Sequence, residues 1–321
     1  MLTFKNILYV VEGDGWQPDA YEQAWRLAEA CQASLTVLDV LAPAPQGLWG
    51  LLGLSSSEAL DVQRLERRYA ELTQLTATHA MSGAVHIQVL CGRPPLEAIR
   101  QVLRAGHDLV IKPMGRVAAL DRVLGGHDMQ LLRKCPCPVW LMARDAPARL
   151  SCVLAAVDVD QEGRLMEATE AFNLSIGVCA AGFAQQHGAA LHLAHFWDAP
   201  GESLIRAWSD HPDEVSLRYV EAEASRHHGA MGLLREALTA RLGADSARAL
   251  SPEFHVRRGM ADSGIPALAN ELKADLVVMG TVGRTGVAGL VVGNTAETIL
   301  EQLQCSILAL KPPGFVSPVS L

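Results

Sequence analysis

Short apolar runs alternate with helix-length segments along the whole chain. The runs at 7–11, 109–111, 153–157 and 276–279 are continuously apolar, which is typical of strands buried in a parallel sheet. The segments between such runs are long enough for helices. These helices are expected near residues 19–32, 58–80, 95–105 and 128–133, and again near 164–187, 213–242, 265–273 and 296–304.

The same features occur twice in the same order, which indicates a tandem duplication. Each copy has a strand that ends in a carboxylate, a glycine after a later strand, an aspartate before another apolar run, and two glycines separated by nine residues. The paired positions are Glu12 and Asp158, Gly92 and Gly259, Asp108 and Asp275, Gly115–Gly125 and Gly283–Gly293, and Cys137 and Cys305. Because residues 144–150 break the pattern, we expect domains at 1–147 and 148–321.

Each half thus predicts five strands connected by helical segments. Strands separated by helices pair in parallel through right-handed crossovers, so each domain is expected to be a doubly wound α/β sheet with helices on both faces. In such sheets, ligands bind beyond the carboxyl ends of the strands. Asp158 and the glycines that follow Met279 both lie at such ends.

Composition and charge narrow the class of protein. Half of the 321 residues are hydrophobic, which is enough to bury the cores of two domains, and the formal net charge is −8 without blocks of Lys or Arg. We therefore expect no nucleic-acid partner and no anionic membrane partner, since both favour a basic surface. The first strand is too short and too soon followed by acids for a signal peptide or membrane span, so a cytoplasmic location is expected. The seven scattered cysteines are interpreted mainly as buried, reduced thiols.

The glycines at 280, 283, 286, 289 and 293 follow an apolar strand and precede a predicted helix. Glycine lets consecutive backbone N–H groups approach an anion, and a helix N-terminus adds further donors, so this loop can hold a phosphate. The Gly-Lys-Ser/Thr of a Walker loop is absent from both halves, and so is the Gly-x-Gly-x-x-Gly dinucleotide motif after the first strand.

The loop spacing Gly-x-x-Gly, nine residues and Gly resembles the ATP-binding loop of the universal stress protein family. The segments that carry the resemblance are Gly280-Thr-Val-Gly283 and Gly293-Asn-Thr. Because the resemblance covers nearly the whole chain in two copies, the chain is similar to the tandem-domain members of this family. It implies two five-stranded domains of the adenine nucleotide alpha hydrolase-like fold. It also implies that strands 139–142 and 307–310 meet in an intramolecular pseudo-dimer; a further homodimer stays open.

The resemblance implies a nucleotide site in the second domain, with ATP or a related adenine nucleotide bound alone or with magnesium. Asp158 would meet the adenosine end, and the amides near Gly293 would hold the phosphates. The family usually has Ser or Thr directly after the last glycine, where this chain has Asn294. The candidate residues are Asp158, Val159, Gly280, Gly283, Arg284, Gly293, Asn294 and Thr295.

The first domain departs from this pattern. Lys112-Pro113 replaces the opening glycine, and proline has no N–H and a fixed φ, which disfavours a phosphate cradle. Glu12 also replaces the family aspartate. We therefore expect a degenerate domain without nucleotide, although Gly126 and His127 retain features that suit an anion.

Other candidate chemistries are weaker. His192 and His195 lie on one predicted strand, where this spacing points the rings to opposite faces, so they cannot jointly hold a metal. His227 and His228 are expected on a solvated helix face. Cys135-Pro-Cys137 lacks further metal ligands nearby, and Cys135 is interpreted as a partly exposed thiol. We therefore expect no metal site and assign no catalytic residue.

Three functions follow from these features. The first is a cytoplasmic stress-response module that binds ATP in its second domain and signals to protein partners. The second is a carrier or interaction protein without nucleotide, in which the Pro/Gly-rich loop around Trp49 binds an apolar ligand or a protein. The third is a slow ATP hydrolase, for which Asp158 is the candidate base. A binding role is favoured over an enzymatic one.

Overall fold

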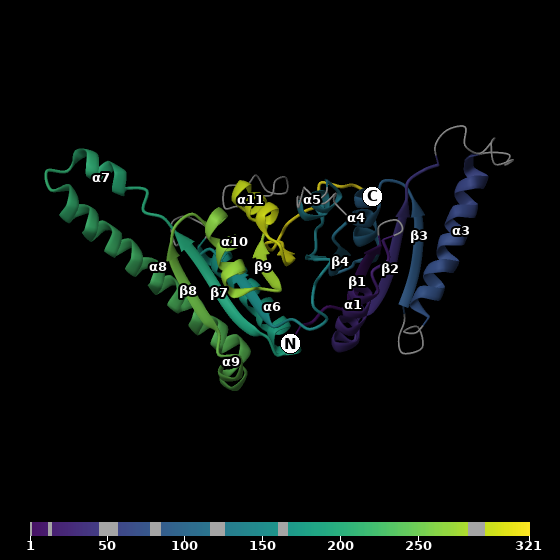
Figure 1. The fold of residues 1–321 in the computed structure, drawn as a ribbon, viewed down its shortest axis with the longest axis horizontal. Coiled ribbons are helices and arrows are strands. Elements are labelled where there is room, and N and C mark those ends of the chain that lie inside the picture. The colour runs from purple at the N-terminus through teal and green to yellow at the C-terminus, as the bar shows by residue number, and fades with distance from the viewer. Residues whose placement is uncertain are drawn as a thin grey trace. The chain divides into compact units, whose positions relative to one another are not determined.

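The computed structural model describes residues 2–11, 15–44, 57–77, 85–115, 126–159, 166–281 and 293–321, and the chain divides into two compact units. The N-terminal unit covers residues 2–148 and 306–321, and the C-terminal unit covers 149–281 and 293–305. Each is an α/β sheet with helices packed against it (Figure 1). The expected α/β fold class is confirmed.

The N-terminal unit has five parallel strands in the order β3-β2-β1-β4-β5, and β10 is added antiparallel to β5. Ile307 of β10 lies opposite Leu141 of β5. The elements are β1 (Asn6–Val11), α1 (Pro18–Cys31), β2 (Ser34–Leu41), α3 (Ser57–Thr76), β3 (Val85–Cys91), α4 (Pro94–Ala105), β4 (Leu109–Pro113), α5 (Gly126–Lys134), β5 (Val139–Met142) and β10 (Ser306–Leu310).

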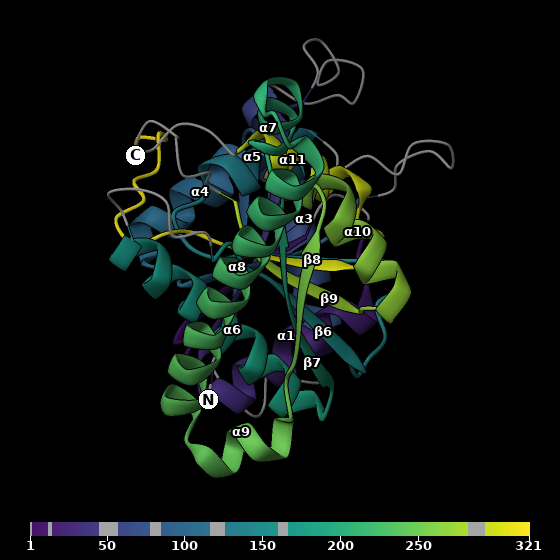
Figure 2. The same cartoon turned by 90° about the vertical axis from the view of Figure 1, so that its left-hand side faces the viewer.

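The C-terminal unit repeats this arrangement with four parallel strands in the order β8-β7-β6-β9. Helices α6 and α8 pack on one another and on the sheet, and α10 packs on β6 and β7 and contacts α11. Figure 2 shows α8 running beside β8. The elements are β6 (Cys152–Ala156), α6 (Met166–His187), β7 (Ala190–Trp197), α7 (Glu202–Trp208), α8 (Pro212–Leu242), α9 (Ala244–Leu250), β8 (Glu253–Arg258), α10 (Ala261–Leu272), β9 (Leu276–Gly280) and α11 (Asn294–Gln302).

The repeated glycines have the same local role in both units. Gly92 follows β3 with a φ of 159°, and Gly259 follows β8 with a φ of 143°, in a range that disfavours a side chain. The Gly92 N–H donates to the carbonyl of Leu41 at 2.9 Å, and the Gly259 N–H donates to that of Trp197 at 2.8 Å. Each glycine thus ties the end of an edge strand to the end of its neighbour.

The repeated aspartates also correspond. Asp108 accepts hydrogen bonds from the backbone N–H groups of Lys5 (2.7 Å) and Asn6 (3.0 Å), where β1 begins. Asp275 accepts from the N–H groups of Ser151 (2.6 Å) and Cys152 (3.1 Å), where β6 begins. The Asp that precedes the fourth strand therefore fixes the start of the first, which explains a repeated residue without involving a ligand.

Two helical predictions need correction. The predicted helix 265–273 begins earlier, at Ala261, and includes Pro266 in its second turn. Proline has no N–H to donate to the carbonyl of Asp262, and this carbonyl instead accepts a hydrogen bond of 3.3 Å from Gln302 Nε2. The helix predicted near 213–242, which was expected to present His227 and His228 to solvent, buries Met231, Leu234 and Leu238 as α8. Among the helices of the described residues, none has both the length and the apolar character needed to cross a membrane.

Candidate functional site

The candidate site of the C-terminal unit lies at the carboxyl ends of β6 and β9. These strands are neighbours, with Ala156 opposite Met279. Asp158 comes two residues after the end of β6, and Gly280 is the last residue of β9. Because parallel strands end at the same edge, the fold brings the two predicted site residues to one edge of the sheet.

The backbone of Asp158 is fixed by Asn173 of α6. The Asp158 N–H donates to Asn173 Oδ1 at 3.0 Å, and Asn173 Nδ2 donates to the Asp158 carbonyl at 2.7 Å. Asn173 is buried, whereas the Asp158 side chain is 57% exposed. The carboxylate is thus presented to solvent from an anchored peptide, while the neighbouring Val159 is buried.

A buried pair of histidines lies behind Asp158. His195 Nδ1 is 3.9 Å from Asp158 Oδ1, and His195 Nε2 shares a hydrogen bond of 2.9 Å with His227 Nδ1. His227 stacks on Trp197 and lies 3.8 Å from Glu223 on α8. His227 is only 3% exposed, so the expectation of a solvated histidine is wrong. The sequence could not show this contact, because its two rings come from a strand and from a distant helix.

Gly280 is required first by packing. A Cβ at this position would lie 2.6 Å from the ring of Phe172 on α6, closer than real contacts allow. This contact gives the glycine a structural role at the strand end. That Gly280 also permits the approach of a ligand stays a prediction.

The two ends of the glycine loop are joined. Thr281 is fully buried, and its carbonyl accepts a hydrogen bond of 3.0 Å from the Gly293 N–H. Gly293 is the N-cap of α11, so Asn294 and Thr295 stand in the first turn, and both are exposed. The first turn of a helix has free N–H groups and positive potential. Gly283 and Arg284 lie outside the described residues.

The corresponding edge of the N-terminal unit holds a buried ion pair instead. Lys112 Nζ at the end of β4 lies 2.7 Å from Asp128 Oδ1 on α5, and their side chains are 3% and 5% exposed. Lys112 also donates to the carbonyl of Pro113 at 3.3 Å. A lysine side chain thus points at the first turn of the helix that corresponds to α11. Glu12 and Gly125 lie outside the described residues.

The cysteine predictions are only partly right. Cys135 is fully buried, with its sulfur 3.5 Å from that of Cys137, so the prediction of a partly exposed thiol is wrong. Cys91 is exposed and free. The Trp49 loop, on which the carrier hypothesis rests, lies outside the described residues.

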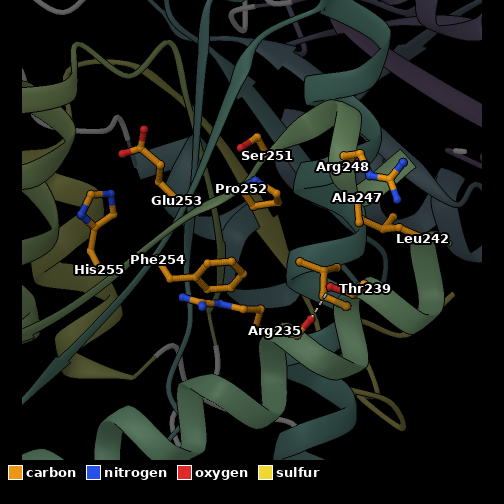
Figure 3. A pocket seen from close by; sticks show the side chains of 11 residues that line it. Arg235, Thr239, Leu242, Ala247, Arg248, Ser251, Pro252, Glu253, Phe254 and His255 are labelled. Carbon is orange, nitrogen blue, oxygen red and sulfur yellow. Dashed lines mark hydrogen bonds between the residues drawn. The ribbon is translucent and has the colours of Figure 1, made fainter. Parts of the chain in front are cut away.

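A surface hollow of about 550 Å³ lies between the end of α8, α9 and the start of β8. Arg235 lies over the ring of Phe254, 4.4 Å from its centroid, and Figure 3 shows both side chains on one side of the strand. The hollow is at the amino end of β8. It is therefore distinct from the edge that carries Asp158, which lies at the carboxyl ends of the parallel strands.

Comparison with known proteins gives consistent matches over the chain. A sequence model of the universal stress protein family matches residues 3–143 and 167–311. Universal stress protein E of Escherichia coli K12 is 27% identical over 329 residues, which cover 100% of this chain and 98% of that protein. The Universal stress protein E homolog of Haemophilus influenzae is 30% identical over 326 residues, which cover 97% and 98%. A crystal structure of a functionally unknown protein from Pseudomonas aeruginosa PAO1 is 26% identical with a TM-score of 0.63, over 96% of this chain and 93% of that one.

Proposed function

The chain belongs to the universal stress protein family, with two family domains in tandem, and on that premise we propose that its C-terminal domain binds ATP or a related adenine nucleotide as a regulatory ligand. The observation that supports this most is the anchored, exposed Asp158 beside the strand that leads into the glycine loop. We also propose that the protein is cytoplasmic and that partner proteins respond to its nucleotide-bound state.

The proposed roles follow from the chemistry of each group. The Asp158 carboxylate accepts hydrogen bonds from the hydroxyl or amino groups of an adenosine, and the main chain of Val159 borders the same ligand. The first-turn N–H groups of α11, at Asn294 and Thr295, face the phosphates, where the helix dipole favours negative charge. Gly283 and Arg284 complete the loop, and magnesium, if bound, neutralises the phosphates.

The N-terminal domain is proposed to bind no nucleotide. In that domain the ammonium of Lys112 is already paired with Asp128 and buried, so a phosphate would have to compete with a carboxylate 2.7 Å away. Pro113 offers no N–H at this strand end. We therefore expect one nucleotide per chain.

Purified full-length protein should release an adenine nucleotide on heating, or bind ATP with one site per chain in a calorimetric titration. Asp158→Asn should weaken binding about tenfold or more, since a hydrogen bond to a charged group contributes about 1.5–3 kcal/mol. Asp198→Asn is the matched control, because Asp198 directly follows the neighbouring strand β7 and is also exposed. Absence of bound nucleotide and of ATP binding in the unaltered protein would refute the proposal.

Hydrolysis is the second candidate, and the 3.9 Å approach of His195 to Asp158 is the observation that favours it. A carboxylate beside an imidazole is a suitable general base for activating water. ATP turnover above background that disappears in Asp158→Asn, while the variant still binds ATP at saturating concentration, would establish an enzyme.

A further inference from the structure

We propose that the C-terminal unit carries a divalent metal site, in which His192, Glu253 and His255 bind a zinc ion. The site does not depend on nucleotide binding and lies at the other end of the sheet. Its ligands come from β7 and from the edge strand β8 of this unit.

Strand register places the three side chains on one face. His192 is the parallel partner of Glu253, and Ala194 is the partner of His255. Side chains two residues apart on a strand point to the same side, so Glu253 and His255 lie on one face of β8. In Figure 3 both side chains point away from Phe254, which lies between them in sequence and faces α8.

The face in question is the one covered by α10. On β7, Phe196 points the same way as His192, and its ring would be 2.2 Å from a Cβ at Gly264 of α10. His195 points to the opposite face, toward His227 of α8. The expectation that His192 and His195 cannot share a metal agrees with this geometry. The imidazole that contacts the His192 side chain is that of His255, more than sixty residues later in the chain.

Two of the distances between ligand atoms, both measured from His192, are close to those of a zinc complex. His192 Nδ1 is 3.0 Å from His255 Nε2 and 3.5 Å from Glu253 Oε2, and all three ligand atoms lie within 4.8 Å of one another. Zinc–nitrogen bonds of about 2.0–2.1 Å in a tetrahedral site place neighbouring ligand atoms about 3.3 Å apart. Only small side-chain rotations are therefore needed to enclose an ion.

Burial of the three residues suits a site that is anchored and also accessible. His192 is 8% exposed, which restricts its ring, whereas the Glu253 side chain is 69% exposed and His255 is partly exposed. An ion can enter from solvent, and water can occupy a fourth position. Two imidazoles and one carboxylate form a known zinc ligand set with an open coordination position.

The nearby cation of Arg257 is paired with another acid, so it does not compete with a metal ion for Glu253. Arg257, which follows on the same face of β8, forms two hydrogen bonds with Glu271 of α10, at 2.7 and 2.9 Å. Glu271 thus neutralises Arg257, and Glu253 remains to offset the charge of the ion. Without metal, the contact of His192 with His255 is a hydrogen bond between two imidazoles, and this is the competing explanation of their proximity.

The test uses full-length protein that has been stripped with EDTA and titrated with Zn²⁺ in competition with a chromophoric chelator. One high-affinity Zn²⁺ per chain is expected. His255→Ala and Glu253→Gln should each weaken binding by about tenfold or more. His228→Ala should bind as the unaltered protein does, because His228 is exposed on α8 and outside the cluster.

Two further measurements make the result decisive. Co²⁺ bound at this site should show a spectrum without thiolate charge transfer, and Zn²⁺ should slow hydrogen exchange at the β8 amides. No Zn²⁺ binding, equal affinity in the variants, or thiolate bands that indicate Cys135 and Cys137 would each overturn the proposal. If His255→Ala does not fold, Glu253→Gln carries the test, because its side chain is exposed.

Discussion

Lys112 and Asp128 form a buried ion pair with a nitrogen–oxygen distance of 2.7 Å, one residue before the strand end at Pro113 that corresponds to Gly280 of the C-terminal unit. This edge of the sheet thus carries a buried ion pair in the N-terminal unit, whereas in the C-terminal unit the corresponding strand leads into a glycine loop. Sequence comparison of the repeats identified the replaced glycine but not the partner of the lysine.

Removing one member of this pair should destabilise the N-terminal unit strongly. Lys112→Met leaves the Asp128 carboxylate buried beside an apolar chain, and losses of about 3–5 kcal/mol are typical of such changes. The double variant Lys112→Met with Asp128→Leu should recover most of that loss. Urea unfolding measures both. A single variant as stable as the unaltered protein would show that the pair makes no net contribution.

Asn173→Asp should affect stability and nucleotide binding together. An Asp at this position can accept from the Asp158 N–H but cannot, when ionised, donate to the Asp158 carbonyl. Loss of the donor to this partly buried carbonyl should cost about 1 kcal/mol, the lower end of the range for buried groups. Thermal melts report the stability, and ATP titration reports the position of Asp158. Unchanged affinity in a destabilised protein would limit Asn173 to a structural role.

Gly280→Ala should destabilise the C-terminal unit by about 1–3 kcal/mol, since the new methyl group overlaps the ring of Phe172. Adding Phe172→Leu should restore much of the stability by making room. Gly126→Ala is the matched control, because nothing lies within 4 Å of its Cβ position. If the double variant is stable yet binds ATP poorly, Gly280 also serves the ligand directly.

Acid should weaken the N-terminal unit through His107. Burial lowers the pKa of this imidazole below its ordinary value of 6.5. Below pH 6.5, His107 therefore binds a proton in the unfolded chain but not in the folded chain, so the free energy of unfolding falls as the pH drops. The loss levels off below the folded-state pKa.

Urea unfolding at pH 7.5, 6.5 and 5.5 measures this dependence, and His107→Gln should reduce its slope. The partly exposed His187 and His255, whose pKa values are also lowered by burial, remain in that variant and contribute to the residual slope. An unchanged slope in His107→Gln would contradict the assignment.

The sequence predicted what depends on short-range pattern and on repetition. Apolar periodicity located the strands, and paired anchors such as Asp108 and Asp275 gave the same element order in both halves. The contacts of single side chains were not predictable, because they join residues far apart in the chain. Asn173 holds Asp158, and His255 approaches His192, only because parallel strands and a covering helix bring them together.

Local composition also misled where packing decided the outcome. The polar segment that contains His227 suggested a solvated helix, yet its ring is buried against Trp197. The helix was also predicted to start near residue 265, yet α10 begins at Ala261 and includes Pro266. In both cases, contacts between distant segments decide the outcome: His227 stacks on Trp197, and Gln302 donates to the Asp262 carbonyl that Pro266 leaves without an N–H partner.

The antiparallel pairing of β10 with β5 has a consequence for how the protein assembles. The strand that covers the edge of β5 is supplied by the same polypeptide, so its effective concentration does not change on dilution. A fragment that ends at residue 148 would expose that edge and recruit a second copy or aggregate. In the tandem chain, β5 is therefore covered by β10 at any protein concentration in the cell.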